Sequence, residues 1–338
     1  MTPPTRQLGR NGPLVTAIGL GMMSIGGAYG QKNTNEEKFA LLDRAYAIGE
    51  RFWDTADVYF DSEELIGEWF QRNPDKRKDI VLATKCGLSY NFETGEQFVD
   101  TSPEYVRKAC EASLKKLKTN TVDLYYCHRV DGKTPIEETI HALVELKNEG
   151  KITHLGLSEV SATTLRRANA VHQIAAHQIE YNPFTLEPEA DVIATARALG
   201  IATVAYSPMG RGFLTGQIKS LDDLPAMGFH RLTPKYNDPE NFQRIMALVR
   251  KFEEVGRKHG KSPAQVCLAW LLRQGEDIVP IPGTRGVKYL EENTAAAELV
   301  LSDEEVRALR EAADATVLPG LRYPAAWAEA LNGDTPEL

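Results

Sequence analysis

The chain has 338 residues, a formal net charge of −8 and a hydrophobic fraction of 42%. This composition is ordinary for a globular protein with a large core, and we predict one domain over residues 1–338. The acidic balance argues against nucleic acid or an anionic membrane as the main partner. No apolar run approaches a membrane span, and residues 1–11 do not resemble a signal peptide. Since the cysteines form no Cys-x-x-Cys pair, we expect reduced thiols and a cytoplasmic location.

Short β-rich runs alternate with longer helical patterns along almost the whole chain. The first element is a predicted hairpin, with strands at 6–8 and 14–16 around turn residues 9–13. Further strands are predicted at 17–20, 51–54, 80–84, 123–127, 152–157, 175–179, 202–205 and 278–281. Helices are predicted at about 36–47, at 63–70, from residue 102, and at 135–148, 162–170, 188–199 and 287–297. Alternation of this kind predicts parallel strands, and eight repeats predict a closed barrel.

The longest interruption lies between the predicted seventh and eighth strands. A Gly/Pro-rich loop at 209–239 is followed by two extra helices at about 240–259 and 262–273. The tail after residue 318 is rich in Pro, Ala and aromatic residues, and either covers one end of the barrel or is a loose terminus. The predicted fold class is therefore α/β, a single (β/α)8 TIM barrel with an N-terminal β-hairpin and extra helices between strands seven and eight.

Four reactive side chains follow three neighbouring predicted strands. Asp54 ends the second strand with Tyr59 five residues later, Lys85 follows the third strand, and His128 follows the fourth. Any one of these is most simply a solvated loop residue or part of an ion pair. Together they lie where barrel enzymes place their reactive groups, at the C-terminal ends of strands. Because an ammonium favours a phenolate, we expect Lys85 to lower the pKa of Tyr59 and to make it a proton donor.

Seven segments around these residues resemble the aldo-keto reductase superfamily and occur in that family's order. They lie at 52–59, 83–85, 126–128, 156–158, 178–181, 205–208 and 281–284. The runs 128–131 and 156–159 resemble a microbial or fungal branch of that family. The resemblance implies NADPH-dependent reduction of aldehydes or ketones to alcohols. It assigns catalytic roles to Asp54, Tyr59, Lys85 and His128, with Tyr59 as the general acid.

The resemblance also implies a binding site for NADPH or NADP+. The matching positions are Met22, Met23, Asp54, Ser158, Gln178, Tyr206, Ser207, Pro208, Gly210, Leu214, Gly283, Thr284, Arg285, Lys288, Tyr289, Glu292 and Asn293. Ser158 and Gln178 match residues that hold the nicotinamide amide, and Tyr206 matches the aromatic side chain that stacks on the ring. Arg285 and Lys288 supply positive charge for a 2′-phosphate and favour NADPH over NADH, although Lys288 also fits a solvated helix face.

The substrate is expected to be a small carbonyl compound. Aromatic side chains are predicted for its pocket, at Tyr29, Phe60, Tyr90, Phe92 and Trp327. Their content favours apolar or aromatic aldehydes and ketones. Glu159 stands where many relatives carry Asn, and we expect this acid to alter the hydrogen bonds around the nicotinamide amide. No metal site is predicted, and the sequence leaves the oligomeric state and the direction of reaction open.

Other functions stay open on the residues alone. Gly19-Leu-Gly21 follows a strand as in a dinucleotide-binding Rossmann fold, but the third glycine of that fingerprint falls at Ser24. Lys85 beside an acid and a phenol also suits a Schiff-base aldolase. A regulatory subunit that senses NADPH with little turnover would keep the same residues. A metal hydrolase is poorly supported, because His128 and His154 lie on different predicted strands.

Overall fold

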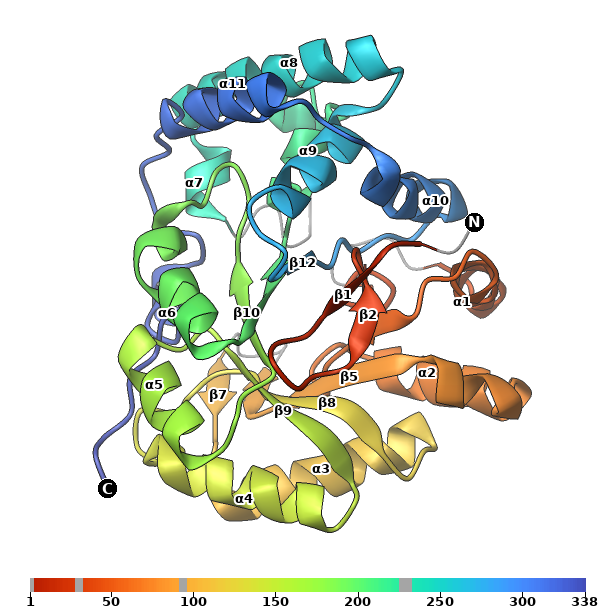
Figure 1. Cartoon of the computed structure of the whole chain (residues 1–338), viewed down its shortest axis with the longest axis vertical. Coiled ribbons are helices and arrows are strands. Elements are labelled where there is room, and N and C mark those ends of the chain that lie inside the picture. Colours follow the sequence, from red (N-terminus) through yellow and green to blue (C-terminus); the bar gives the residue numbers. More distant parts are fainter. Residues whose placement is uncertain (1–2, 28–32, 91–95, 225–232) are drawn as a thin grey trace.

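The computed structural model describes residues 3–27, 33–90, 96–224 and 233–338 as a ring of strands surrounded by helices (Figure 1). One parallel sheet in this part of the chain contains β3 (Leu20–Gly21), β4 (Phe52–Asp54), β5 (Val81–Cys86), β8 (Val122–Cys127), β9 (Ile152–Ser158), β10 (Ala176–Glu180), β11 (Ala202–Tyr206) and β12 (Ile278–Pro280). These eight strands are hydrogen-bonded in that order. The predicted alternation and the predicted parallel sheet are confirmed.

The first and last strands meet and close the barrel. Gly21 bridges to Gly283 in parallel, and the Gly19 N–H donates to the carbonyl of Pro280 at 2.9 Å. A Cβ at Gly21 would lie 2.7 Å from the carbonyl oxygen of Ile281, so any side chain there would hold the two strands apart. The pair of glycines that resembled a Rossmann fingerprint therefore serves barrel closure.

Helices follow the strands and cover the outside of the barrel. They are α1 (Asn35–Ala47), α2 (Ser62–Arg72), α3 (Pro103–Leu117), α4 (Ile136–Asn148), α5 (Ala162–Val171), α6 (Val192–Leu199) and α10 (Val287–Ala295). The insertion after β11 holds α7 (Pro234–Asn237), α8 (Pro239–His259) and α9 (Pro263–Leu272). One helix that was not predicted, α11 (Asp303–Asp314), packs on α8 at the periphery (Figure 1).

The N-terminal hairpin closes one end of the barrel. Strands β1 (Thr5–Gln7) and β2 (Leu14–Thr16) pair antiparallel, as predicted. Leu8 and Val15 are buried in one cluster with Phe52 and Val279, which point into the barrel. In Figure 1 the hairpin lies across the end of the barrel that faces the viewer. Ligands must therefore enter from the opposite end, where the strands have their C-terminal ends.

Two segments near the open end differ from the prediction. An unpredicted hairpin follows β5 and consists of β6 (Leu88–Tyr90) and β7 (Gln97–Val99). The C-terminal tail is ordered and contains the short helix α12 (Ala325–Ala328). The rings of Tyr90 and Trp327 pack edge to face at 5.2 Å, so the tail reaches across to the hairpin. Of the two possibilities left open for the tail, the structure supports the one in which it covers the barrel.

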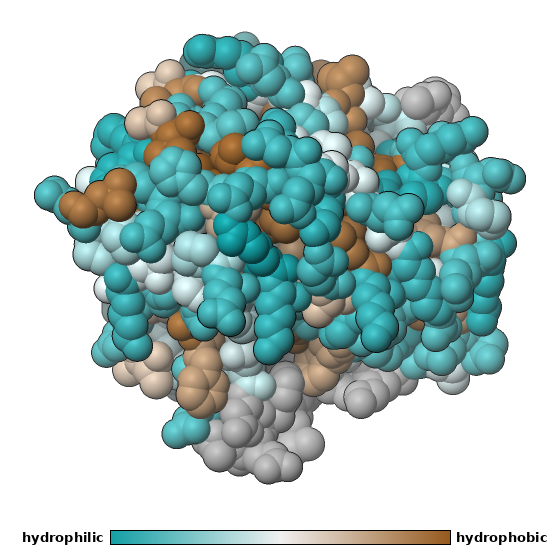
Figure 2. Space-filling view, turned by 90° about the horizontal axis from the view of Figure 1, so that it is seen from below, coloured by the Kyte–Doolittle hydropathy of each residue, from teal (hydrophilic) through white to brown (hydrophobic). Residues whose placement is uncertain are grey.

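The surface view in Figure 2 is mostly hydrophilic, with hydrophobic side chains gathered in small areas. Within the described ranges, no helix is both long and apolar enough to cross a membrane.

Candidate active site

A buried ion pair forms the base of the site. The Lys85 ammonium donates to Oδ1 of Asp54 at 2.6 Å and to the carbonyl of Thr55 at 2.6 Å. Gln178 Nε2 donates to the other carboxylate oxygen of Asp54 at 2.8 Å. The side chain of Lys85 is 0% exposed and that of Asp54 is 2% exposed. The parallel register explains why Lys85 reaches Asp54: Asp54 pairs with Ala83, and Lys85 lies two residues further along β5, on the same face of the sheet.

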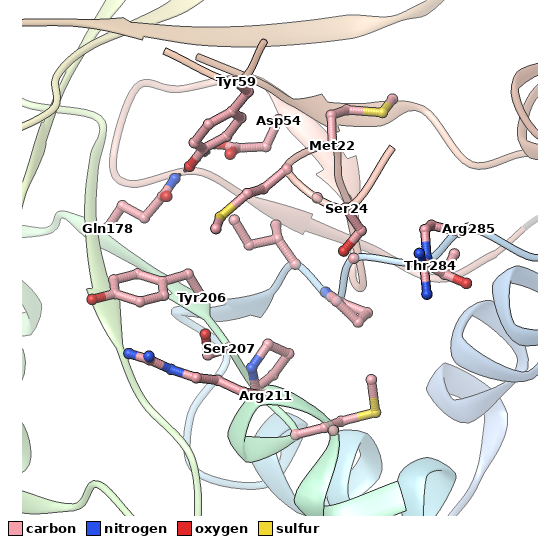
Figure 3. Close-up of a pocket in the computed structure, with 18 of the residues that line it drawn as sticks. Met22, Ser24, Asp54, Tyr59, Gln178, Tyr206, Ser207, Arg211, Thr284 and Arg285 are labelled. Carbon is pink, nitrogen blue, oxygen red and sulfur yellow. Dashed lines mark hydrogen bonds between the residues drawn. The ribbon is translucent and has the colours of Figure 1, made fainter. Parts of the chain in front are cut away.

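Tyr59 lies above this ion pair. Its ring centroid is 4.8 Å from the Lys85 nitrogen, and Figure 3 shows its side chain beside those of Asp54 and Gln178. Burial raises the pKa of the Tyr59 phenol, and the positive charge of Lys85 opposes this rise only in part. The expectation that Lys85 brings the pKa of Tyr59 below its usual value is therefore wrong, because desolvation is the larger effect. Tyr59 is a protonated phenol at neutral pH.

Lys85 is held in its charged form. Burial by itself would lower the pKa of Lys85, but Asp54 and Tyr59 raise it above its ordinary value. A Schiff-base lysine needs a neutral, accessible amine. The buried and protonated ammonium of Lys85 has neither property, which argues against the aldolase.

His128 stands beside Tyr59, with the two rings edge to face and their centroids 5.8 Å apart. Burial lowers the pKa of His128 well below its usual range, and the positive charges of Arg129 and Lys85 lower it further. The imidazole is thus neutral at pH 7 and has one N–H to donate. Arg129 Nη1 donates to the His128 carbonyl at 2.6 Å and to Ser158 Oγ at 3.1 Å. Arg129 therefore ties the end of β8 to the end of β9.

The four side chains adjoin one end of an elongated cavity of about 840 Å³. Asp54, Tyr59 and His128 line it directly, whereas Lys85 is sealed beneath them. Many of the positions predicted for cofactor or substrate also line it: Met22, Met23, Ser158, Gln178, Tyr206, Ser207, Pro208, Gly283, Thr284, Arg285, Tyr289, Glu292, Asn293, Phe60, Tyr90 and Trp327. The structure thus brings residues from both ends of the chain to one site.

The other end of the cavity is suited to an anion. Figure 3 shows Thr284 and Arg285 at the side of the cavity away from Tyr59 and Asp54. The two residues come just before Gly286, the N-cap residue of α10, and the first turn of this helix has backbone N–H groups without partners inside the helix. A helix start with a guanidinium and a hydroxyl is a favourable place for a phosphate. A long cavity with an aromatic face at Tyr206 and an anion-binding end fits a dinucleotide.

Five predicted site residues need separate mention. Gly210 and Leu214 do not line the cavity: Leu214 is fully buried in the hydrophobic core, and a Cβ at Gly210 would meet the ring of Phe184. Lys288 also lies outside the lining, because its side chain is 77% exposed and faces Glu292. Tyr29 and Phe92 lie outside the described residues.

Backbone strain is concentrated around the cavity. Phe60, Glu159, Ser207 and Arg211 have positive φ angles between 47° and 57°, although none is glycine. Three of them line the cavity, and Glu159 follows the lining residue Ser158. A left-handed conformation is costly for such residues and persists where surrounding contacts fix it, most often at functional sites.

Comparisons with known proteins agree with this geometry. The family model described as "Aldo/keto reductase family" matches residues 17–314. The chain belongs to the aldo/keto reductase family. It is 48% identical to aldo-keto reductase str7 of Strobilurus tenacellus, over 100% of this chain and 99% of the relative. It is 46% identical to aldo-keto reductase yakc [NADP(+)] of Schizosaccharomyces pombe, again over 100% and 99% of the two chains.

Solved structures support the same assignment. A glycerol dehydrogenase from Gluconobacter oxydans superposes with a TM-score of 0.83 at 29% identity, covering 94% of this chain and 97% of the other. A thermostable aldo-keto reductase bound to epalrestat superposes with a TM-score of 0.72 at 29% identity, covering 91% and 99%. The resemblance to this family, including its fungal members, is thus confirmed, and the protein is an oxidoreductase of the aldo/keto reductase type.

Several cavity residues of this aldo/keto reductase were not predicted from sequence. They include Ser24, Arg129, Arg211, Ser262, Tyr323 and Leu331. Because Arg129 directly follows His128, the sequence alone indicates that it lies near the active site. Tyr323 and Leu331 come from the tail, and nothing local in the sequence indicates which wall of the cavity they form. Among the described residues, no three His, Cys, Asp or Glu side chains are grouped as a metal site would need.

Proposed function

We propose that this chain is an NADPH-dependent carbonyl reductase that converts aldehydes or ketones to alcohols with Tyr59 as the general acid. The observation that carries the proposal is the Asp54–Lys85 ion pair, buried directly beneath a protonated Tyr59 at one end of a dinucleotide-sized cavity. The name of the Schizosaccharomyces pombe relative, which includes NADP(+), supports the choice of cofactor.

The chain's own residues have distinct parts in the proposed reaction. The Tyr59 hydroxyl donates its proton to the carbonyl oxygen, and the Lys85 ammonium stabilises the phenolate that forms. Asp54 keeps Lys85 charged and in place. The neutral His128 donates a hydrogen bond to the carbonyl oxygen and so orients it. NADPH, when bound, supplies the hydride to the carbonyl carbon, so one hydride and one proton convert the carbonyl to an alcohol.

The cofactor would lie along the cavity. Ser158 and Gln178 would hold the nicotinamide amide and Tyr206 would face the ring, while Thr284 and Arg285 would hold the 2′-phosphate. Aromatic walls at Tyr90, Trp327 and Tyr323 favour apolar or aromatic carbonyl compounds. One domain over residues 1–338 and a cytoplasmic location stay predictions.

The direct test is a fluorescence titration with NADPH, followed by NADPH oxidation with a panel of aromatic aldehydes. We expect tight binding and turnover of several aldehydes. Binding of NADPH without reduction of any carbonyl compound would favour the regulatory NADPH sensor. Absence of NADPH binding would overturn the cofactor assignment.

Cofactor choice has its own test at Arg285. Arg285→Gln is expected to raise the Kd for NADPH about tenfold or more and to leave the Kd for NADH within about twofold, because only NADPH carries the 2′-phosphate. Lys288→Gln is the matched control: this exposed side chain is not part of the cavity wall, and its loss is expected to change neither constant. An equal effect of Arg285→Gln on both nucleotides would contradict the assignment.

A further inference from the structure

Glu159 does not face the cavity where the amide of the nicotinamide is expected. It is 0% exposed and turns towards the C-terminal tail, where Arg322 binds both of its oxygens at 3.0 Å. Burial would raise the pKa of Glu159, but Arg322 and other donors lower it to about 2, so the carboxylate is charged at all physiological pH values. The expected effect of Glu159 on the hydrogen bonds around the nicotinamide amide stays a prediction, whereas its contacts in the structure run to the tail.

The same carboxylate holds the aromatic face of the cavity. The Tyr206 hydroxyl donates to Oε1 of Glu159 at 2.8 Å, and the Tyr323 hydroxyl donates to the Tyr206 oxygen at 3.1 Å. Tyr206 and Tyr323 both line the cavity, in contrast to Glu159. Because the donor to a charged acceptor is held more strongly than one to a neutral acceptor, Glu159 fixes the orientation of Tyr206.

Glu159 also anchors a second point of the tail. Its carbonyl accepts from the Gly333 N–H at 2.8 Å, so residues 322 and 333 both attach to this one residue. Between these two points, Tyr323, Trp327 and Leu331 form part of the cavity wall. The orientation of Tyr206 and the position of the tail residues that line the cavity therefore both depend on the buried Glu159.

Arg322 is held in turn by a second buried acid. It lies 3.4 Å from Glu180, which also pairs with Arg211 at 3.3 Å, and the Arg211 guanidinium lies 4.4 Å from the Tyr323 ring centroid. The carboxylates of Glu159 and Glu180 are thus neutralised by the guanidinium groups of Arg211 and Arg322. Removing one member of such a buried network leaves an uncompensated charge, and this is costly in free energy. The network therefore favours one arrangement of these four side chains.

We propose that Arg322 is a positioning residue, which acts through Glu159 to hold Tyr206 in place as the face for the nicotinamide ring and so couples the tail at 318–333 to cofactor binding. The proposal rests on the proposed use of a nicotinamide cofactor. It predicts that loss of Arg322 weakens the binding of the nicotinamide half and spares the adenosine half, which is bound at the distant Thr284–Arg285 end.

The test compares two ligands in equilibrium titrations of the full-length protein. NADPH carries the nicotinamide, whereas 2′-phospho-ADP-ribose has the same adenosine 2′-phosphate and pyrophosphate without it. Arg322→Met is expected to raise the Kd for NADPH about tenfold or more and to leave the Kd for 2′-phospho-ADP-ribose within about twofold. Arg322→Lys keeps the charge but loses the two-pronged contact, and its NADPH constant is expected to lie between those of the wild type and Arg322→Met.

The chain supplies a matched control ion pair away from the cavity. Arg310 binds Glu189 through two contacts at 2.8 and 2.7 Å, and Glu189 accepts from the Tyr181 hydroxyl at 2.5 Å. The arrangement repeats that of Arg322, Glu159 and Tyr206, but none of its residues lines the cavity. Arg310→Met is therefore expected to change neither ligand constant.

A second variant keeps the test valid if Arg322→Met does not fold. Glu159→Gln combined with Arg322→Met leaves no buried unpaired charge from this pair and is expected to fold, yet to show the same selective loss of NADPH affinity. Limited proteolysis gives an independent readout, because coupling is reciprocal: NADPH must protect the tail from cleavage in the wild type more than 2′-phospho-ADP-ribose does.

The results separate this proposal from the proposed function. If the wild type binds 2′-phospho-ADP-ribose but not NADPH, the nicotinamide assignment itself fails. If the wild type binds both, an unchanged NADPH constant in a folded Arg322 variant, or an equal loss for both ligands, overturns the positioning role.

Discussion

Substitutions in the buried Asp54–Lys85 pair can separate its effect on the free energy of unfolding from its effect on carbonyl reduction. Lys85→Met removes the ammonium and leaves a carboxylate that is 2% exposed, with the Gln178 amide as its side-chain donor. Removing one partner of a buried pair costs roughly 3–5 kcal/mol in the free energy of unfolding. Proteins of this kind have a total of roughly 5–15 kcal/mol, so Lys85→Met is expected to be folded but marginal.

Removing both charges should relieve most of this loss. Asp54→Asn combined with Lys85→Met places a neutral amide opposite an apolar chain, and we expect it to be more stable than Lys85→Met alone by about 2 kcal/mol or more. Carbonyl reduction is expected to stay lost in both variants, since no ammonium stabilises the Tyr59 phenolate. Recovered stability without recovered activity would therefore show that the charged pair has a part in the chemistry beyond its part in stability.

Urea unfolding at pH 7 gives the free energies, and NADPH oxidation gives the activity. Arg197→Met is the control, because Arg197 makes an exposed two-contact pair with Asp277 at 2.9 Å whose loss is expected to cost at most about 1 kcal/mol. A cost for Lys85→Met no larger than that of the control would refute the reasoning, as would a double variant no more stable than the single one.

Three further predictions concern pH and thiols. Burial raises the pKa of Glu50 to about 8 against 4.5 for a free side chain, so the contribution of Glu50 to the free energy of unfolding falls as pH rises from about 4.5 to 8, by at most ~5 kcal/mol. Glu50→Gln should remove this contribution, so its free energy of unfolding relative to wild type, from urea unfolding, should be higher at pH 8.5 than at pH 5; an equal difference at both pH values would contradict this. Because neither Tyr59 nor His128 changes charge there, kcat/KM for reduction should be flat from about pH 6 to 9, and a step in that profile would show that one of them titrates. The thiols are all buried: Cys86, Cys110, Cys127 and Cys267. Ellman's reagent should therefore label them only after unfolding, and rapid labelling of the native protein would contradict their burial.

The repeating architecture was predictable because each strand and helix leaves a local pattern. The barrel followed from alternation alone, and the residues just past the strand ends identified Asp54, Lys85 and His128 as neighbours. Helix α11 was also readable in principle, since Ser302 and Glu305 form a capping box at its start. This helix lies beyond the eight strand–helix repeats, so the alternation does not predict it.

The contacts of the tail were not predictable, because they join residues far apart in sequence. Arg322 meets Glu159 across 163 positions, and no periodicity or turn signal encodes such a pairing. The direction of the pKa shift of Tyr59 was predicted wrongly for a related reason. The charge of Lys85 is visible in the sequence, whereas the desolvation that outweighs it depends on how completely the folded chain buries the phenol.

The central claim is that Tyr59 protonates the carbonyl oxygen in an NADPH-dependent reduction. Single-turnover absorbance of the reduced nicotinamide, with saturating NADPH and an aromatic aldehyde, compares wild type with Tyr59→Phe. Our account predicts that the variant binds NADPH within about twofold of wild type and that its reduction rate falls roughly 10²–10⁴-fold. A Tyr59→Phe variant that reduces the aldehyde at the wild-type rate would contradict the account.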